Sequence, residues 1–225
     1  MAEPIRSKPL ARVPHAFSNA HGARVEDIIP GGREVRVKQV HSARVLAVTE
    51  PFADPLPEAD GLVTDCPGLV LSIVTADCAP VLLADEDAGV IGAVHAGWRG
   101  AVAGIAPHAV ARMEELGADR SRIRAAIGPC IAQKSYEVDA PFRDQFSADA
   151  DRFFERKDTA HWLFDLPGFV AASLAEAGVE AEILPHDTYT ERAGKAYRFH
   201  SYRRATHHGE ATGGRQLSMI ALPMP

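Results

Sequence analysis

The chain has 225 residues, a length that fits one large unit of mixed helices and strands or two compact halves. Its formal net charge of −6 argues against a non-specific nucleic-acid binder, because such proteins present a basic excess to phosphates. No run of about 18 apolar residues is present to cross a membrane, and the first residues lack the apolar segment of a secretory signal. We therefore expect a cytoplasmic protein with neither nucleic acid nor a membrane as partner.

The first half of the chain reads mainly as strands. Residues 34–49 alternate around Val35, Val37 and Gln39, which predicts strand structure around His41. Residues 51–61 are dense in Pro, Asp and Gly and predict a loop. Three short runs of high β-propensity follow, and we expect them to form the central part of a sheet; they span residues 69–77, 79–85 and 89–96.

The second half mixes helices with further strands. From Trp98 to Leu116 the apolar residues follow a helical stripe that Gly117 would stop, with Pro107 predicting a kink or a later start. Asp165 is a candidate cap, with Pro167 in the first turn of the helix that follows. Other segments predict helices at 139–147 and 166–179 and strands at 123–131, 180–184 and 216–222. Without a repeat or linker, the pattern favours one α+β domain over residues 1–225.

Cys78 and His95 each interrupt an apolar run, and together with His41 they offer two imidazoles and a thiol. The three cysteines of the chain are an odd and sparse set, typical of free thiols in a reducing compartment. If the folded chain brings His41, Cys78 and His95 together, they supply three ligands for Zn²⁺ and leave a fourth position open, as in catalytic zinc sites. Thiolate and imidazole also bind copper, so the ligand types alone do not name the metal.

Other uses of the same residues stay open. Taken singly, each of the three also fits an ordinary core or surface role. Asp77 precedes Cys78 and is a candidate to orient a ligand, while the glycines after His95 permit close approach of the backbone. Cys78 is alternatively a metal-free nucleophile whose thiolate a histidine favours. Multicopper oxidase chemistry is disfavoured, because none of the ten histidines forms a His-x-His pair.

Two further segments are candidate cavity walls. Gly128 and Pro129 mark a tight turn beside Cys130, which fits either a packed thiol or a wall of a pocket. Residues 197–216 combine aromatic residues with four arginines, whose planar guanidinium groups match phosphate geometry; they are Arg198, Arg203, Arg204 and Arg215. A solvated, glycine-rich loop explains that segment equally well.

Five segments in order resemble the family of laccase-domain or polyphenol-oxidase-like proteins, also named peptidoglycan editing factors and purine nucleoside phosphorylases. They read "KQVHSARV", "ADGLVTDCPGLVLSIVTADCAPVLLAD", "GVIGAVHAGWRG", "IGPCIAQKSYEV" and "FHSYRRATHHGEATGGRQ". The resemblance implies a four-layer α/β/β/α sandwich with mixed β-sheets. It also implies that His41, Cys78 and His95 bind a catalytic zinc, and that the substrates are inorganic phosphate with adenosine, inosine or S-methyl-5′-thioadenosine. Deamination of adenosine is a further activity that the resemblance implies.

The sequence departs from the family pattern at two places. Thr188 stands where the family usually has a cysteine, and "RRATHHG" stands where it usually reads "RRDG". Both departures leave the three metal-ligand candidates in place and concern the C-terminal pocket wall, which bears on substrate preference.

The implied reactions require an anion site and a proton carrier. For phosphate we expect Arg44 or Arg99, with Arg203 and Arg204 as alternatives. For deamination, the H-x-E signature of nucleotide deaminases is missing after His95, and Asp77 is our candidate proton carrier. The competing hypothesis is a metal-free Cys/His hydrolase that acts on amide-linked peptidoglycan precursors, and a copper-dependent polyphenol oxidase ranks behind both.

Overall fold

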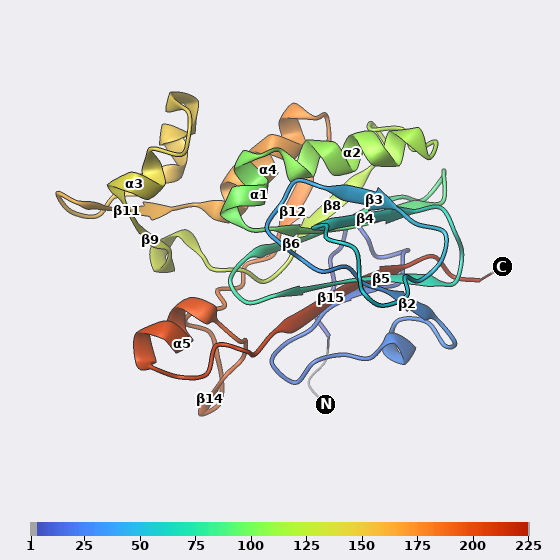
Figure 1. Ribbon diagram of the computed structural model, residues 1–225, viewed down its shortest axis with the longest axis horizontal. Coiled ribbons are helices and arrows are strands. Elements are labelled where there is room, and N and C mark those ends of the chain that lie inside the picture. The colour runs from blue at the N-terminus through green and yellow to red at the C-terminus, as the bar shows by residue number, and fades with distance from the viewer. Residues whose placement is uncertain (1–3, 225) are drawn as a thin grey trace.

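Two mixed β-sheets pack face to face at the centre of the computed structural model, which describes residues 4–224 (Figure 1). The larger sheet has the order β12-β8-β6-β7-β4-β3, with strands Ala181–Ile183, Arg124–Ile127, Ala79–Asp85, Val90–Ala96, Gly61–Thr64 and Val45–Ala47. The smaller has the order β1-β15-β5-β2, with strands His15–Phe17, Gln216–Ala221, Leu69–Thr75 and Arg33–Val35. The pairs β3–β4, β8–β12 and β2–β5 are parallel and the other pairs antiparallel, so both sheets are mixed.

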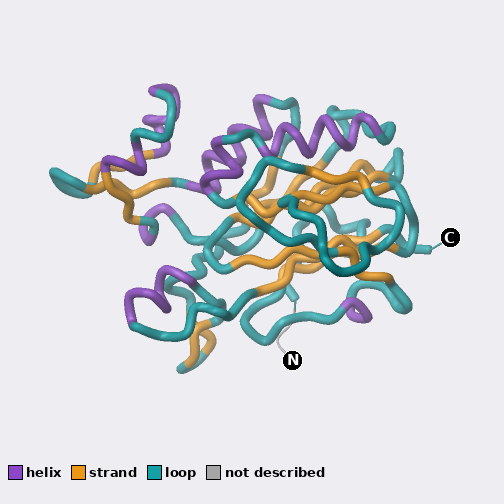
Figure 2. Tube along the Cα trace, viewed as in Figure 1, coloured by secondary structure: helices purple, strands orange, loops and turns teal. Residues whose placement is uncertain are grey.

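Helices cover the outer face of the larger sheet. They are α1 (Trp98–Val102), α2 (Ile105–Glu115) and α4 (Leu166–Glu176), and Figure 2 shows them as one layer above the strands. The remaining described elements are α3 (Ala140–Arg143), α5 (Tyr202–His208), the 3₁₀ helices η1 (Val25–Asp27), η2 (Gln133–Ser135) and η3 (Ala148–Phe153), and the short strands β9 (Glu137–Asp139), β10 (Phe154–Arg156), β11 (His161–Phe164), β13 (Arg192–Ala193) and β14 (Ala196–Tyr197).

Alternation along the strands divides the apolar residues between two cores. In β6, Val81 and Leu83 pack under the helices, whereas Leu82 packs against the smaller sheet. Leu71 and Ile73 of β5 meet Leu82 from the other side. Because successive strand residues point to opposite faces, a run buried on both faces is continuously apolar, as these runs are.

The outer face of the smaller sheet is covered by the N-terminal chain. Val70 and Met219 form a third apolar cluster with Ile29, against which Val25 and Ile28 pack. This fourth layer contains the 3₁₀ helix η1. The prediction of an α+β sandwich with mixed sheets is confirmed, while residues 1–3 and 225 of the predicted domain lie outside the described part of the chain.

Several local predictions were wrong or incomplete. Residues 34–49 form no continuous strand, because β2 and β3 belong to different sheets and His41 lies in the loop between them. The first of the three apolar runs, β5, lies in the smaller sheet, whereas β6 and β7 are central in the larger one. The segment 139–147 is helical only over α3, and the arginine-rich segment contains helix α5.

The predicted helix from Trp98 to Leu116 is divided into two. Gly104, with φ of 84°, separates α1 from α2, while Pro107 sits in the first turn of α2, where a proline needs no hydrogen-bond partner. The predicted end at Gly117 is confirmed, because α2 ends at Glu115 and Gly117 has a φ of 96°. The Asp165 cap of α4 is confirmed as well, because the Asp165 side chain accepts a hydrogen bond from Gly168 N.

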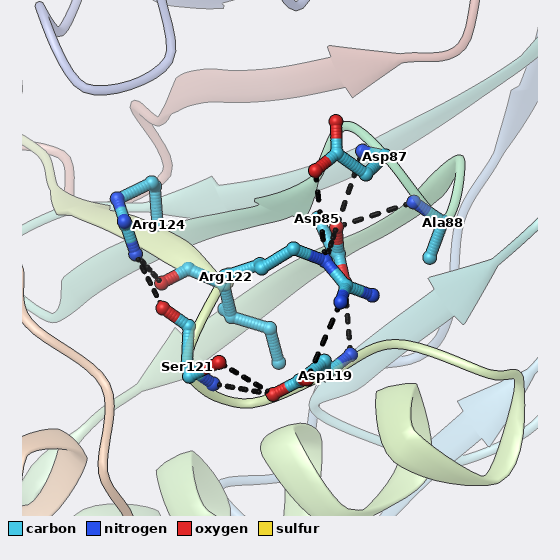
Figure 3. Close-up of polar contacts among 8 residues, drawn as sticks. Asp85, Asp87, Ala88, Asp119, Ser121, Arg122 and Arg124 are labelled. Carbon is cyan, nitrogen blue, oxygen red and sulfur yellow. Dashed lines mark hydrogen bonds and ion pairs between the residues drawn. The ribbon is translucent and has the colours of Figure 1, made fainter.

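A buried carboxylate joins the β6–β7 hairpin to the loop before β8 (Figure 3). Asp85 accepts hydrogen bonds from the backbone N–H groups of Asp87, Ala88 and Asp119, and its Oδ2 lies 3.1 Å from Nη2 of Arg122. Its side chain is fully buried, so these donors replace the water that the charge would otherwise need. These contacts fix the hairpin end of β6 and β7. Cys78 and His95 lie at the opposite end of this strand pair.

Candidate metal and substrate site

Three side chains from separate segments converge at one end of the sandwich. The ligand atoms of His41, Cys78 and His95 all lie within 4.8 Å of one another, and Sγ of Cys78 is 3.9 Å from Nε2 of His41. His95 lies near the end of β7 opposite Pro80 of β6, and Cys78 immediately precedes β6. The antiparallel pairing of β6 with β7 therefore brings the thiol and the imidazole together, as the sequence predicted.

His41 lies in the loop between β2 and β3 and has an unusual backbone conformation. Its φ is 62°, in the left-handed region that non-glycine residues seldom adopt. The carboxylate of Asp60 stabilises this turn, because it accepts hydrogen bonds from the backbone N atoms of Val40 (3.2 Å), His41 (2.9 Å) and Ser42 (2.6 Å). The Ser42 hydroxyl donates to the same group at 2.7 Å.

Asp60 also orients His95. Its Oδ1 lies 2.8 Å from Nδ1 of His95, and the carboxylate is fully buried. A carboxylate at Nδ1 fixes the ring and leaves Nε2 as the ligand nitrogen, the usual arrangement behind a metal-binding histidine. We expected this orienting role at Asp77, whereas the structure places it at Asp60, a residue that no local pattern in the sequence singled out.

Gly97 provides the space for the three donors. A Cβ atom at this position would lie 2.8 Å from Cδ2 of His41 and 3.0 Å from Sγ of Cys78. Contacts that short displace one neighbour or the other. The glycine after His95 is thus required for close packing, which agrees with the expected close approach of the backbone.

The hydrogen bonds within the site change its protonation. Burial opposes a charge on Cys78, but hydrogen bonds with His41 and His95 outweigh it and lower the pKa of the thiol to about 6. Burial likewise opposes a charge on His95, whereas hydrogen bonds with Asp60 and Cys78 raise its pKa to about 9. The pKa of Asp60 is held well below its usual range, despite burial, by His95 and Ser42. A thiol ionised near neutral pH is the form that binds metals and attacks electrophiles.

The three donors line a cavity of about 580 Å³. Arg99 of α1, Arg203 of α5 and Arg215 before β15 line the same cavity. Its apolar wall includes Ile131 and Tyr136. A cavity of this size accommodates a small organic ligand, and the arginines favour an anionic one.

An extension built from α3 and β9–β11 holds part of this wall (Figure 1). Phe142 packs against Trp98 at the start of α1 and against Tyr136, with ring centroids 4.8 Å and 5.8 Å apart. These contacts fix the aromatic wall relative to the first turn of α1, which carries Arg99.

The amino-acid sequence matches a known protein family over most of its length. Residues 19–223 match the family described as multi-copper polyphenol oxidoreductase laccase. The chain belongs to this family. Two relatives named purine nucleoside phosphorylase, from Rickettsia prowazekii and Deinococcus radiodurans, are 40% and 42% identical to it. The alignments cover 83% and 84% of this chain and 77% and 70% of the relatives.

Two solved structures share the fold of this chain. The crystal structure of YlmD from Geobacillus stearothermophilus superimposes with a TM-score of 0.83 at 27% identity, over 97% of this chain and 94% of that one. The Bacillus licheniformis protein YfiH gives a TM-score of 0.82 at 27% identity, over 95% of this chain and 94% of that one.

Among the residues described, no helix combines the length and apolar character needed to cross a bilayer.

The structure separates the arginines that the sequence grouped as phosphate ligands. Arg99 and Arg203 line the cavity, whereas Arg44 is exposed outside the lining and donates to the Glu58 carbonyl. Arg204 is buried and donates to the carbonyls of Thr188, Tyr189 and Phe199. Neither Arg44 nor Arg204 is therefore in position to contact a ligand in this cavity.

Two other residues that the sequence singled out, Asp77 and Cys130, make contacts within the protein that hold the fold together. Asp77 lines the cavity, but both oxygens of its carboxylate already accept hydrogen bonds within the protein. The donors are the hydroxyls of Thr188 and Ser201 and the backbone N of Arg203. Cys130 is buried in the core under the helices, where burial raises the pKa of its thiol, and the adjacent Ile131 supplies the cavity wall instead.

Proposed function

We propose that this protein is a metal-dependent purine nucleoside phosphorylase that acts on adenosine, inosine and S-methyl-5′-thioadenosine, with adenosine deaminase activity alongside. The observation that carries the proposal is the common cavity, which is lined by the three metal donors and by three arginines. The names of the relatives from Rickettsia prowazekii and Deinococcus radiodurans supply the reaction class.

The donor set fits a zinc ion. His41, Cys78 and His95 would hold it, with His95 oriented by Asp60 and the thiol ionised near neutral pH. Three protein ligands with a position left for solvent or substrate are typical of catalytic zinc, and copper is the alternative that the same ligands accept. When bound, the ion would supply Lewis acidity and ease the ionisation of a water molecule.

Phosphorolysis needs an anion held beside the sugar. A phosphate oxygen forms a bond to C1′ of the ribose while the C1′–N9 bond breaks, and the purine leaves with the electron pair and takes up a proton. Arg99, Arg203 and Arg215 would neutralise and orient the phosphate, which is the main electrostatic requirement of the step. The apolar wall with Tyr136 suits the flat base.

Deamination needs a proton carrier as well as water. Water adds at C6 of adenosine and ammonia leaves, so a proton must move from the attacking oxygen to the departing nitrogen. Asp77 was our candidate, yet it accepts three hydrogen bonds from the protein, and one of them would have to break for it to serve.

Product analysis of purified protein of known metal content tests the proposal. Inosine incubated with inorganic phosphate should release hypoxanthine and ribose 1-phosphate, and the protein should contain about one zinc ion per chain. Omission of phosphate should stop the release. Hypoxanthine formation at the same rate without phosphate would show a hydrolase and refute the phosphorylase. Ammonia release from adenosine tests the deaminase separately.

A second candidate function rests on the low thiol pKa. The pKa of Cys78 near 6 suits a nucleophile, and His95 with Asp60 behind it resembles the base and orienting group of a cysteine hydrolase acting on amide-linked cell-wall precursors. Activity on such a precursor that survives chelation of metal but is lost on thiol alkylation would favour this hydrolase. Activity lost on chelation and restored by zinc favours the phosphorylase.

A further inference from the structure

One carboxylate ties the metal-donor loop to the helix that carries Arg203. Asp77 is buried, directly precedes Cys78 and has φ of 84°. Its Oδ1 accepts from the Thr188 hydroxyl at 2.6 Å, while its Oδ2 accepts from the Ser201 hydroxyl at 2.9 Å and from Arg203 N at 2.7 Å. Ser201 is the N-cap of α5, so the first turn of this helix is anchored one residue away from a metal donor.

Contacts within the protein also hold the guanidinium of Arg203 in place, and they leave two of its three nitrogens available to a ligand. Its Nη1 donates to the Glu137 carbonyl at 2.7 Å, and its guanidinium lies 5.2 Å from the centre of the Tyr136 ring. Within residues 4–224, Nη1 makes the hydrogen bond of the Arg203 guanidinium, and its Nε and Nη2 have no hydrogen-bond partner. These two groups lie on one edge of the guanidinium, and that edge donates two parallel hydrogen bonds to two oxygens of a phosphate.

The other arginines near the site are held differently. Arg99 is exposed and lies over the Trp98 ring at 4.5 Å. Arg215 is exposed and donates to the carbonyls of Thr212 and Gly214. Arg203 is half-buried and is the only one of the three whose backbone is tied to the loop that bears Cys78. A pre-positioned guanidinium loses little side-chain freedom when it binds an anion, so it binds the anion more tightly.

We propose that Arg203 is the principal phosphate ligand of the cavity and that Asp77 is a positioning residue that holds Arg203 at a fixed place relative to Cys78. The inference deepens the proposed function and rests on it for the use made of the phosphate. The binding of phosphate itself can be measured without turnover, so the two proposals fail separately.

Calorimetric titration of the zinc-loaded protein with inorganic phosphate tests the site. Arg203→Met should weaken phosphate binding about 10- to 100-fold, because it removes two charge-assisted hydrogen bonds. Asp77→Asn should weaken it about tenfold or more and leave the zinc content unchanged, because Asn tolerates the left-handed backbone but turns an acceptor oxygen into a donor. Arg12→Met, at an exposed arginine 86% accessible in its side chain, is the control and should bind phosphate as the wild type does.

A double variant separates positioning from general damage. If Asp77 acts through Arg203, Asp77→Asn should weaken phosphate binding in the wild type but add little in the Arg203→Met background. In turnover, both variants should raise KM for phosphate far more than KM for inosine. Additive effects, loss of zinc from Asp77→Asn, phosphate binding that survives Arg203→Met, or a wild-type protein that binds no phosphate would each overturn the inference. A wild type that binds phosphate through Arg203 without phosphorolysis would refute the proposed function alone.

Discussion

Oδ1 of Asp60 accepts a hydrogen bond from the backbone N of His41 at 2.9 Å and lies 2.8 Å from Nδ1 of His95. One buried oxygen therefore fixes two of the three candidate metal donors, His41 through its backbone and His95 through its ring. Such a carboxylate raises the basicity of the histidine and reduces the motion that a bound metal would have to arrest.

Asp60→Asn should reduce zinc affinity by about 10- to 100-fold, because the amide keeps the size of the carboxylate but replaces an accepting oxygen with a donating nitrogen. Competition with a chromophoric chelator measures the change. Glu58→Gln is the matched control, since Glu58 is exposed and pairs with Lys38, away from the donors. Equal zinc affinity of Asp60→Asn and the wild type would contradict the orienting role.

Cys78→Ala should abolish zinc binding, phosphorolysis and deamination together, because the variant lacks the thiolate of the donor set. Elemental analysis and the inosine and adenosine assays check the three losses. Cys66→Ala should retain all three properties, since Cys66 is remote from the donor group and contacts Asp65. Full turnover by a zinc-free Cys78→Ala protein would rule out the metal mechanism.

Gly97→Ala should impair the site while leaving the fold intact. The added methyl group would lie 2.8 Å from Cδ2 of His41 and 3.0 Å from Sγ of Cys78, so the donors must move apart and zinc affinity should fall about tenfold or more. Gly213→Ala is the control, because its Cβ would meet no atom within 4 Å. Unchanged zinc affinity in Gly97→Ala would mean that the donors have more room than the structure shows.

Asp85→Asn should lower the free energy of unfolding at pH 7 by about 1 to 3 kcal/mol, the usual cost of losing hydrogen bonds to a buried charge (Figure 3). Burial opposes the charge, but hydrogen bonds from Asp119 N and Arg122 outweigh it and lower the pKa of Asp85. Because the folded-state pKa is the lower one, this stability is present above the unfolded-state pKa and is lost as the pH falls through the folded-state value.

Urea unfolding of wild type and Asp85→Asn from pH 7 downward measures that difference, which should shrink in acid. Asp87→Asn is the matched control, since Asp87 is 80% exposed in its side chain and its oxygen lies 3.7 Å from Arg122 Nε. A surface pair of this kind contributes little. A stability difference for Asp85→Asn that stays constant with pH would show that its effect is not electrostatic.

Local pattern predicted β5, β6 and β7, the end at Gly117 and the cap at Asp165, because strand and helix periodicity and capping depend on neighbouring residues. The same reasoning was wrong around His41, where the alternation continues but no strand forms. Asp60 binds the backbone N–H groups of residues 40–42 there, and these groups are then not available to a sheet.

By itself the sequence determined the apolar strands β5, β6 and β7, and it predicted, by resemblance, the three candidate donors His41, Cys78 and His95. Only the tertiary structure decided what surrounds them. Asp60, and not the neighbouring Asp77, orients His95, and Arg203 lines the cavity while its neighbour Arg204 is buried. These assignments depend on where distant segments meet in space and on which hydrogen bonds a buried charge can find there, and neither is encoded in spacing along the chain.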